Sequence, residues 1–242
     1  LFFCAFLTFS LFSQKATESA KIQNSLIDKK QLQEKSIVKN VDFQNIGPTI
    51  MSGRVADVDV NPKNPEEFYV GYASGGLWYT KNNGTTFTPV LDNSPTQNVG
   101  DIAVDWKTKP IWVGTGEKNS SRSSYAGIGM LKSKDKGKTW ENVGLLDSHH
   151  ISRILINPEN SEEVIVAVIG HLYSANKERG IFKTTDGGET WKKTLFINKD
   201  TGIIDVQAAP ENFEVMYAAS WERERKAWNF KGSGKNSAIY KS

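Results

Sequence analysis

An eight-residue phrase recurs along the chain and restricts the folds that it can adopt. Two copies, Ser133–Trp140 (SKDKGKTW) and Thr184–Trp191 (TTDGGETW), share an aspartate, a glycine and a final tryptophan, and Thr80–Phe87 (TKNNGTTF) is a looser copy. The copies start 53 and 51 residues apart. A period of about 50 residues is typical of β-propeller blades rather than of helical solenoids.

A short apolar strand ends at the first residue of each phrase, and two further strands precede it. In the first repeat, residues 55–60 and 68–72 flank a turn rich in Asn and Pro. Alternating apolar residues bounded by such turns indicate half-buried strands. With the strand that follows the phrase, each repeat has the four antiparallel strands of one blade, which buries its faces only against neighbouring blades. We predict an all-β propeller with blades at residues 54–91, 99–144, 151–196 and 202–242, the last one incomplete.

The two ends of the repeat region predict how a ring would close. Phe43–Gly47 (FQNIG) resembles Trp140–Gly144 (WENVG), which follows a phrase, yet it precedes the first blade. We interpret residues 41–47 as a closing strand that completes the last blade and removes open sheet edges. Because the chain stops at Ser242, one residue into a fourth phrase, we predict an arc of about four blades from a larger ring. The remaining blades would belong to the same full-length chain, and a four-bladed ring is the alternative.

The N-terminal segment indicates export. Residues 1–12 are apolar and uncharged, which is too short for a bilayer span of about 20 residues but suits a secretory signal over residues 1–14, truncated at its start. A buried strand is the alternative. The only cysteine, Cys4, lies in this run, so no disulfide framework is expected, and residues 15–40 read as a polar linker or a frayed helix. We expect a secreted, periplasmic or cell-surface protein without a transmembrane span.

Charge and motif content exclude several classes of partner. The 30 basic and 27 acidic residues are interspersed, without the basic stripe that binds nucleic acid. No zinc, haem or phosphate-loop motif is present, and Ser74-Gly75-Gly76 has no helix after it to bind an anion. The neighbours His149 and His150 would point in opposite directions in an extended segment. The sequence therefore predicts no metal site and no cofactor.

The recurring phrase itself is interpreted as structural. An Asp or Asn side chain can accept hydrogen bonds from its own turn, glycine permits a positive φ, and the final aromatic packs between sheets. A catalytic or calcium-binding aspartate is the alternative, but a carboxamide takes its place in the first copy and would be a poor general base. The residues given this structural role are Asn82, Gly84, Phe87, Asp135, Gly137, Trp140, Asp186, Gly188 and Trp191.

The phrase resembles the Asp-box of bacterial-neuraminidase-type (BNR) repeats over about residues 43 to 242. Four segments, Asn45–Pro48, Ser52–Arg54, Ser74–Trp78 and Val113–Glu117, are most similar to secreted bacterial propellers related to the sortilin ligand-binding domain, which are often labelled glycosyl hydrolases. The resemblance implies that the repeat hairpins lie opposite the ligand. The loops between blades, and those between second and third strands, would then carry the site.

Those loops contain the candidate ligand-binding residues. Aromatic side chains beside Arg and Glu can stack on sugars and pair with polar groups, although such residues can equally form a solvated, salt-bridged loop. Arg54 and Arg153 are interpreted as equivalent residues at the start of inner strands, where their side chains could point into the central channel. They would bind either a carboxylate, as the arginines of sialidases do, or backbone carbonyls at the start of the blade. The candidates are Arg54, Arg122, Arg153, His171, Tyr173, Trp221, Arg225 and Trp228.

Catalytic residues are harder to assign. A glycosidase needs two carboxylates about 5 to 9.5 Å apart, and Glu117, Glu222 and Asp92 are candidates without a pairing argument. Asp-box xyloglucan hydrolases, by resemblance, have an aspartate just before the Gly-Gly of the first blade, where this chain reads Gly71-Tyr-Ala-Ser-Gly-Gly76. We therefore favour a propeller that binds a protein, peptide or glycan ligand. The alternatives are a sialidase-like or xyloglucan-hydrolase-like glycoside hydrolase whose carboxylates lie partly outside this sequence, and a structural part of a larger surface protein.

Overall fold

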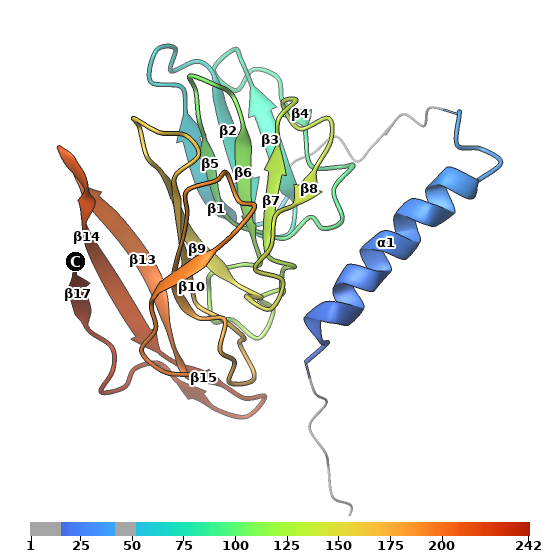
Figure 1. Ribbon diagram of the computed structural model, residues 1–242. Coiled ribbons are helices and arrows are strands. Elements are labelled where there is room, and N and C mark those ends of the chain that lie inside the picture. Colours follow the sequence, from blue (N-terminus) through green and yellow to red (C-terminus); the bar gives the residue numbers. More distant parts are fainter. Residues whose placement is uncertain (1–15, 42–51) are drawn as a thin grey trace, which may run out of the picture.

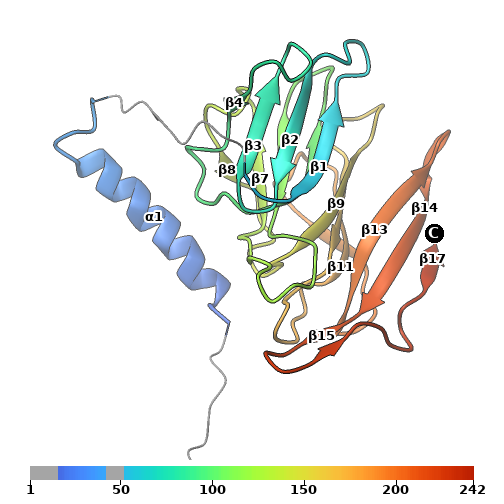
Figure 2. The same cartoon turned by 180° about the vertical axis from the view of Figure 1, so that it is seen from behind.

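The computed structural model describes residues 16–41 and 52–242, and its second part is a fan of antiparallel sheets (Figures 1 and 2). Blade one contains β1 (Val55–Val60), β2 (Phe68–Tyr72), β3 (Gly76–Thr80) and β4 (Thr88–Pro89). Blade two contains β5 (Val99–Val104), β6 (Ile111–Thr115), β7 (Met130–Ser133) and β8 (Glu141–Asn142). Blade three contains β9 (Ile151–Ile156), β10 (Val164–Val168), β11 (Gly180–Thr184) and β12 (Lys192–Leu195).

The fourth sheet is built differently. It joins β13 (Thr201–Ala209), β14 (Asn212–Glu222) and β17 (Ile239–Lys241), and a separate hairpin of β15 (Glu224–Arg225) and β16 (Phe230–Lys231) lies between β14 and β17 in sequence. In every blade the strands pair in chain order, so each is a simple meander. The predicted all-β propeller architecture is confirmed.

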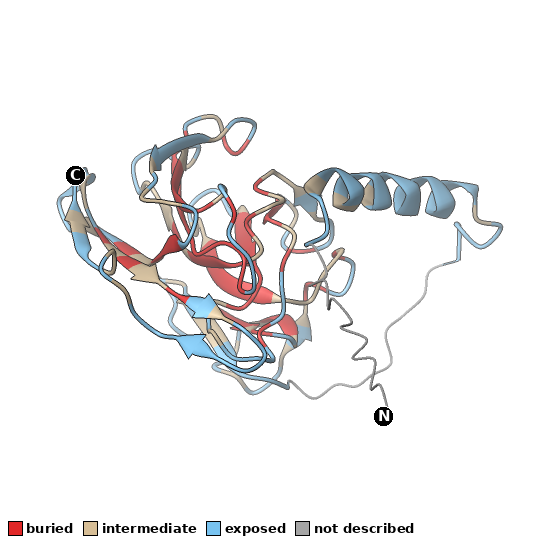
Figure 3. Cartoon of the chain, turned by 90° about the horizontal axis from the view of Figure 1, so that it is seen from below, coloured by how far each residue is buried: buried red, intermediate tan, exposed pale blue. Residues whose placement is uncertain are grey.

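The N-terminal region contributes one helix to the described residues. Within the segment predicted as a polar linker or a frayed helix, α1 (Ser19–Lys35) is rich in Lys and Gln, which favour helices, and none of its side chains is buried (Figure 3). No helix in the described ranges combines the length and apolarity that crossing a membrane requires. The signal predicted at residues 1–14 and residues 42–47 of the predicted closing strand lie outside the described residues.

Hydrophobic side chains fill the spaces between successive blades. One cluster joins blades one and two, a second joins two and three, and a third joins three and four. The strands β6 and β10 are buried along their whole length because both faces of their sheets are covered. Figure 3 shows the same concentration of buried residues in the middle of the fan. Burial between sheets, rather than within one sheet, therefore forms the core.

Each repeat turn is closed by its acidic or amide side chain. Asp186 Oδ1 accepts hydrogen bonds from the Thr184 hydroxyl at 2.6 Å and from the backbone amide of Thr190 at 2.9 Å. Asp135 and Asn82 accept the corresponding pair within their own turns. Hydrogen bonds from the threonine that ends the turn lower the pKa of Asp135 to about 2. The oxygens of these side chains are therefore used within the turn, and the Asn82 amide accepts the same two hydrogen bonds as the carboxylates.

The tryptophan that ends a phrase connects its blade to the preceding one. The indole nitrogen of Trp191 donates to the carbonyl of Val143 at 2.6 Å, and that of Trp140 donates to the carbonyl of Val90 at 2.8 Å. Both acceptors directly follow the outermost strand of the preceding blade. The phrase therefore turns the chain and also sets the spacing of blades at their outer edges.

The innermost strands share a one-residue irregularity. In every blade one residue is skipped in the pairing just before Asp57, Asp101, Arg153 or Asp205. A bulge redirects the side chain next to it, so these four residues occupy equivalent places. The predicted equivalence of Arg54 and Arg153 is wrong, because the strand register aligns Arg153 with Asp57 and leaves Arg54 ahead of β1.

Two of the inner aspartates connect their blade to the next. Asp57 Oδ2 accepts a hydrogen bond from the backbone amide of Ile102 at 3.2 Å, and Asp101 Oδ2 accepts one from Ile154 at 2.8 Å. These amides would otherwise lack a partner on the channel side of their strand, and buried backbone groups require one. The carboxylates thus set the spacing of the blades at their inner edges.

Arg153 brings the inner carboxylates together. Its guanidinium nitrogens lie 2.9 Å from Asp205, 3.4 Å from Asp101 and 3.8 Å from Asp57, measured to carboxylate oxygens. Lys118 adds a second cation 3.0 Å from Asp101. Blade three is the only one of the four with a cation at this place, and its charge offsets three like charges that would repel one another.

Burial controls the acid–base behaviour of Asp101. Its side chain is fully buried, and burial raises its pKa to about 7, an effect that Asp57 reinforces and that Lys118 and Arg153 oppose. The unfolded chain would have a pKa near the ordinary value of about 3.9. Between these two values the folded protein binds more protons than the unfolded one, so its stability falls as the pH rises.

We expect Asp101 to make the free energy of unfolding decline by up to about 1.4 kcal/mol per pH unit between about pH 4 and pH 7. The variant Asp101→Asn removes this contribution, because an amide does not ionise yet still accepts from Ile154. Urea unfolding at several pH values measures both slopes. Parallel slopes for the two proteins would show that Asp101 is ionised throughout this range.

Two neighbouring inner strands, β5 and β9, approach each other closely at Gly100. A Cβ atom there would lie 2.1 Å from the carbonyl oxygen of Ile151 and 2.3 Å from that of Gly116. We expect Gly100→Ala to lower the free energy of unfolding by about 1 to 3 kcal/mol, since backbone would have to move. The control Gly232→Ala meets mainly the Phe230 ring, at 3.1 Å or more, and should change stability by less than about 0.5 kcal/mol. Equal denaturant midpoints for the two variants would contradict the close approach.

Candidate functional site

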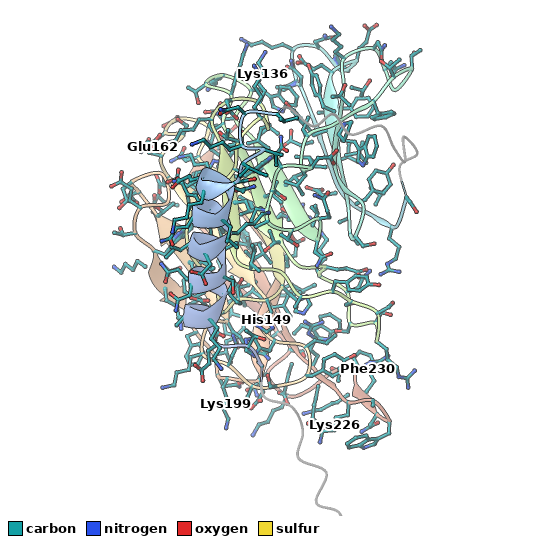
Figure 4. All side chains as sticks on the ribbon, turned by 90° about the vertical axis from the view of Figure 1, so that its right-hand side faces the viewer. Lys136, His149, Glu162, Lys199, Lys226 and Phe230 are labelled. Carbon is teal, nitrogen blue, oxygen red and sulfur yellow. The ribbon has the colours of Figure 1, made fainter. Side chains whose placement is uncertain are left out.

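The two ends of the blades differ in composition. Because strands alternate in direction, the repeat turns emerge at one end, and the second-to-third-strand loops and blade connections emerge at the other. Figure 4 shows Lys136 and Glu162 at the first end and His149, Lys199 and Lys226 at the second. We call the second end the loop face. It contains most of the candidate ligand-binding residues.

A groove of about 670 Å³ lies on the loop face between blades two and three. The rings of Tyr125 and Tyr173 are 52% and 54% exposed and provide apolar surface there. Neutral polar groups surround these rings. The lining residues are Ala16, Thr17, Ser124, Tyr125, Ala126, His149, His150, His171, Leu172, Tyr173 and Ser174.

Two histidines stack against each other in this groove. The rings of His149 and His171 lie 3.6 Å apart between centroids, with 21° between their planes. His149 adopts a left-handed backbone conformation (φ 55°), and its carbonyl accepts a hydrogen bond from the amide of Gly127 at 2.7 Å. Burial lowers the pKa of His149 to about 4 and also lowers that of His171. Both imidazoles are therefore neutral at pH 7.

A polar network holds His171 in place. Its Nε2 lies 3.0 Å from Asp147 Oδ1, and its Nδ1 lies 2.8 Å from the Ser174 hydroxyl. The Asn176 side chain accepts from the backbone amide of His171 at 3.1 Å and donates to the carbonyl of Asp147 at 2.7 Å. The connection between blades two and three is thus fixed to the β10–β11 loop.

The structure groups titratable residues that are separated in sequence. The potential ligand atoms of Asp147, His149 and His171 all lie within 4.8 Å of one another. His150 turns away from them, and its Nδ1 contacts the carbonyl of Glu117 at 2.8 Å. His149 and His150 therefore face different ways, as the sequence predicts for neighbours in an extended segment. The sequence gives no signal for the pairing of His149 with His171, which depends on how two blades pack.

Glu117 is fully engaged by neighbouring donors. Arg54 binds both of its carboxylate oxygens, at 2.6 and 2.7 Å, and Asn119 donates a further hydrogen bond at 3.0 Å. Burial raises the pKa of Glu117, but these hydrogen bonds outweigh that effect and hold it below its usual value. An ionised carboxylate with this many partners suits a structural ion pair between blades one and two better than a general acid.

The other carboxylate candidates have different surroundings. Glu222 accepts hydrogen bonds from Lys231 and from the Asn236 side chain, and the contact with Lys231 is the main reason why its pKa is lowered. Asp92 is an exposed residue that follows β4. Glu117 and Glu222 are therefore each bound to a different cation, Arg54 in one case and Lys231 in the other.

Three loops of different blades touch on the loop face. Arg122 of blade two donates from Nε to the carbonyl of Ala227 in blade four at 3.0 Å, and its own backbone carbonyl accepts a hydrogen bond from the Tyr173 hydroxyl of blade three at 3.1 Å. Trp228 follows directly and is 82% exposed. The structure thus brings the predicted residues Arg122, Tyr173 and Trp228 to one region.

Two other predicted residues serve the β15–β16 hairpin. The indole of Trp221 donates to the carbonyl of Gly232 at 2.8 Å, and the Arg225 guanidinium stacks over the ring of Phe230 at 4.8 Å. Sequence reasoning missed Arg223, which is 3% exposed and donates to the carbonyl of Asn119 in blade two at 3.0 Å. Nothing in the sequence distinguishes this buried arginine from Arg225.

Comparisons with known proteins show the fold. No family model matches the chain. An alignment 154 positions long, which covers 56% of this chain and 17% of the relative, shows 25% identity to the probable oligoxyloglucan-reducing end-specific xyloglucanase of Neosartorya fischeri. Among solved structures, the chain is similar to a GH74 enzyme from Niastella koreensis, with a TM-score of 0.54 and 20% identity over 77% of this chain and 28% of that one.

Two further structures give the same result. An ancestral GH74 enzyme has a TM-score of 0.53 and 18% identity over 78% of this chain and 27% of its own. An auxiliary nutrient binding protein from Bacteroides thetaiotaomicron has a TM-score of 0.50 and 11% identity over 78% of this chain and 42% of its own. The chain spans less than half the length of each of these proteins. At these identities the similarity establishes that the described blades have a β-propeller fold.

Proposed function

We propose that this chain is the ligand-binding arc of a secreted or cell-surface propeller, and that its ligand binds in the groove between blades two and three. The observation that supports this most directly is the pair of half-exposed rings, Tyr125 and Tyr173, in a groove where hydrogen bonds to Ser174 and to the Asp147 carboxylate hold His171 in place. A glycan fits this surface best. A peptide or a protein segment is the other class of ligand that the groove suits.

The physical properties of the groove favour a neutral, hydroxyl-rich ligand. Its volume of about 670 Å³ falls within the range of about 300 to 1,000 Å³ that is usual for small-molecule sites. Tyrosine rings offer an apolar face to a sugar ring and a hydroxyl to its polar edge. The imidazoles are neutral at pH 7 and therefore offer no positive charge to an anionic ligand.

The repeat turns support assignment to the Asp-box class. Their aspartate or asparagine closes the turn, and their tryptophan reaches the preceding blade, which is a structural use of every residue in the phrase. We include in the proposal the sortilin-like BNR relationship, a signal at residues 1–14, a closing strand at residues 41–47 and further blades in the same full-length chain.

Glycoside hydrolysis is the second candidate function, favoured by the similarity to GH74 enzymes and to the Neosartorya relative. Two observations speak against it. The segment before the Gly-Gly of blade one has Ser74 in place of a carboxylate. Glu117 and Glu222 have lowered pKa values, whereas a general acid needs a raised one.

We expect Tyr125→Ala and Tyr173→Ala each to weaken ligand binding by about 3- to 10-fold, the loss of roughly 1 kcal/mol of ring contact. Screening the purified protein on glycan and peptide arrays identifies the ligand, and isothermal titration calorimetry measures the affinities. Tyr217→Ala is the matched control, because this ring is 45% exposed but does not line the groove. A ligand bound equally well by all three variants would place the site elsewhere.

We expect no release of reducing ends from xyloglucan and no release of sialic acid from sialosides. Glu222→Gln and Glu117→Gln separate the two functions, because a hydrolase loses turnover on loss of a catalytic carboxylate while it keeps its ligand. Glu117→Gln should also lower the melting temperature, since Arg54 loses its charged partner. Turnover that Glu222→Gln abolishes without a change in melting temperature would establish the hydrolase function instead.

A further inference from the structure

We propose that Asp147, His149 and His171 form a binding site for a divalent transition-metal ion, with zinc as the best match, on the loop face between blades two and three. Two imidazole nitrogens and a carboxylate oxygen make a common zinc ligand set. Here these atoms lie within 4.8 Å of one another. The proposal holds whichever ligand the groove binds.

The backbone presents these residues from two rigid segments. Asp147 and His149 belong to the connection between β8 and β9, and His171 lies in the loop after β10. A Cβ atom on Gly116 would lie only 1.8 Å from the carbonyl oxygen of His149, so blade two is packed directly against this connection. His149 is held at a φ of 55°, a conformation that few residues without a structural or functional reason adopt.

The imidazole of His149 has unused binding capacity. Within the described part of the chain its ring contacts are with His171 and His150, and neither of its nitrogens makes a hydrogen bond. Polar groups that are partly buried normally find a partner. The ring lines the groove, so an ion from solvent can reach it.

His171 is prepared for an ion at Nε2. Its Nε2–H now donates to Asp147 Oδ1, and its Nδ1 accepts from the Ser174 hydroxyl. A metal ion that binds Nε2 and Oδ1 takes the place of the proton between them. The proton then resides on Nδ1 and is donated to the Ser174 oxygen, because a hydroxyl can act as donor or acceptor. Such outer hydrogen bonds orient ligating histidines in known metal sites.

The remaining geometry requires only side-chain movement. Zinc bonds of about 2.0 to 2.2 Å place ligand atoms about 3.3 to 3.6 Å apart, so the cluster must contract and the stacked rings must splay. The Asp147 side chain is 37% exposed and can turn toward the ion. Glu178 adds a carboxyl group close to Asp147, and its Oε2 is buried without a hydrogen-bond partner among the described residues. Three protein ligands leave at least one coordination position for water or for a polar group of a ligand in the groove.

The test uses the purified full-length protein, stripped of metal with a chelator and titrated with ZnCl₂ in a calorimeter. We expect one saturable site, a melting temperature that rises with zinc, and visible absorption when Co²⁺ replaces zinc. His149→Ala, His171→Gln and Asp147→Asn should each weaken zinc binding by more than about 10-fold, in keeping with the cost of disturbing even outer-shell groups. Asp135→Asn is the matched control, because Asp135 lies in a repeat turn at the other end of the blades, where Asn82 makes the same hydrogen bonds in the first copy.

The zinc titrations of the three variants have two possible results. Zinc binding that the three variants leave unchanged would place the ion elsewhere and overturn the proposal, as would the absence of saturable binding in a protein that melts cooperatively. Each variant is also melted without metal. A variant with an unchanged metal-free melting temperature and no Co²⁺ absorption supports the site even if another variant fails to fold.

Discussion

No blade of this protein can bury its faces alone, and the contacts between blades support every other feature of the structure. The strands β6 and β10 are buried along their whole length, which is achieved only when both neighbouring sheets are in place. Polar groups then fix the spacing at two edges. Asp101 reaches the amide of Ile154 at the inner edge, and Trp191 reaches the carbonyl of Val143 at the outer edge.

The fixed spacing of the blades also brings together the residues of the groove and of the histidine cluster. His149 comes from a connection between blades and His171 from the following blade, yet their rings stack because the blades cannot move apart. Arg122 joins loops of three blades in the same way. The groove and the histidine cluster therefore belong to the packing of neighbours, and no single repeat contains either of them.

This origin explains which features the sequence could predict. The repeat turns were predictable because their hydrogen bonds join residues two and four positions apart, and Asn82 already indicated that the acidic group holds a turn. The equivalence of Arg54 and Arg153 failed because Arg153 is the third residue of β9 and shares its register with Asp57, whereas Arg54 precedes β1, and local sequence does not fix where a strand starts to within a few residues. The partners of Glu117 and His149 were hidden for another reason, since sequence spacing does not encode which side chains meet across a blade interface.

The positions of the carboxyl groups support the proposed ligand binding more than they support hydrolysis. The carboxyl group with a strongly raised pKa, Asp101, is buried at the inner edge of the blades, where it connects blade two to blade three. On the loop face, Glu117 and Glu222 are ionised and bound to cations, so neither has a proton to give to a leaving group. The groove instead presents aromatic faces and neutral imidazoles. The proposed ligand binding would use stacking and hydrogen bonds, and the proposed metal ion would add a further contact, so neither requires proton transfer.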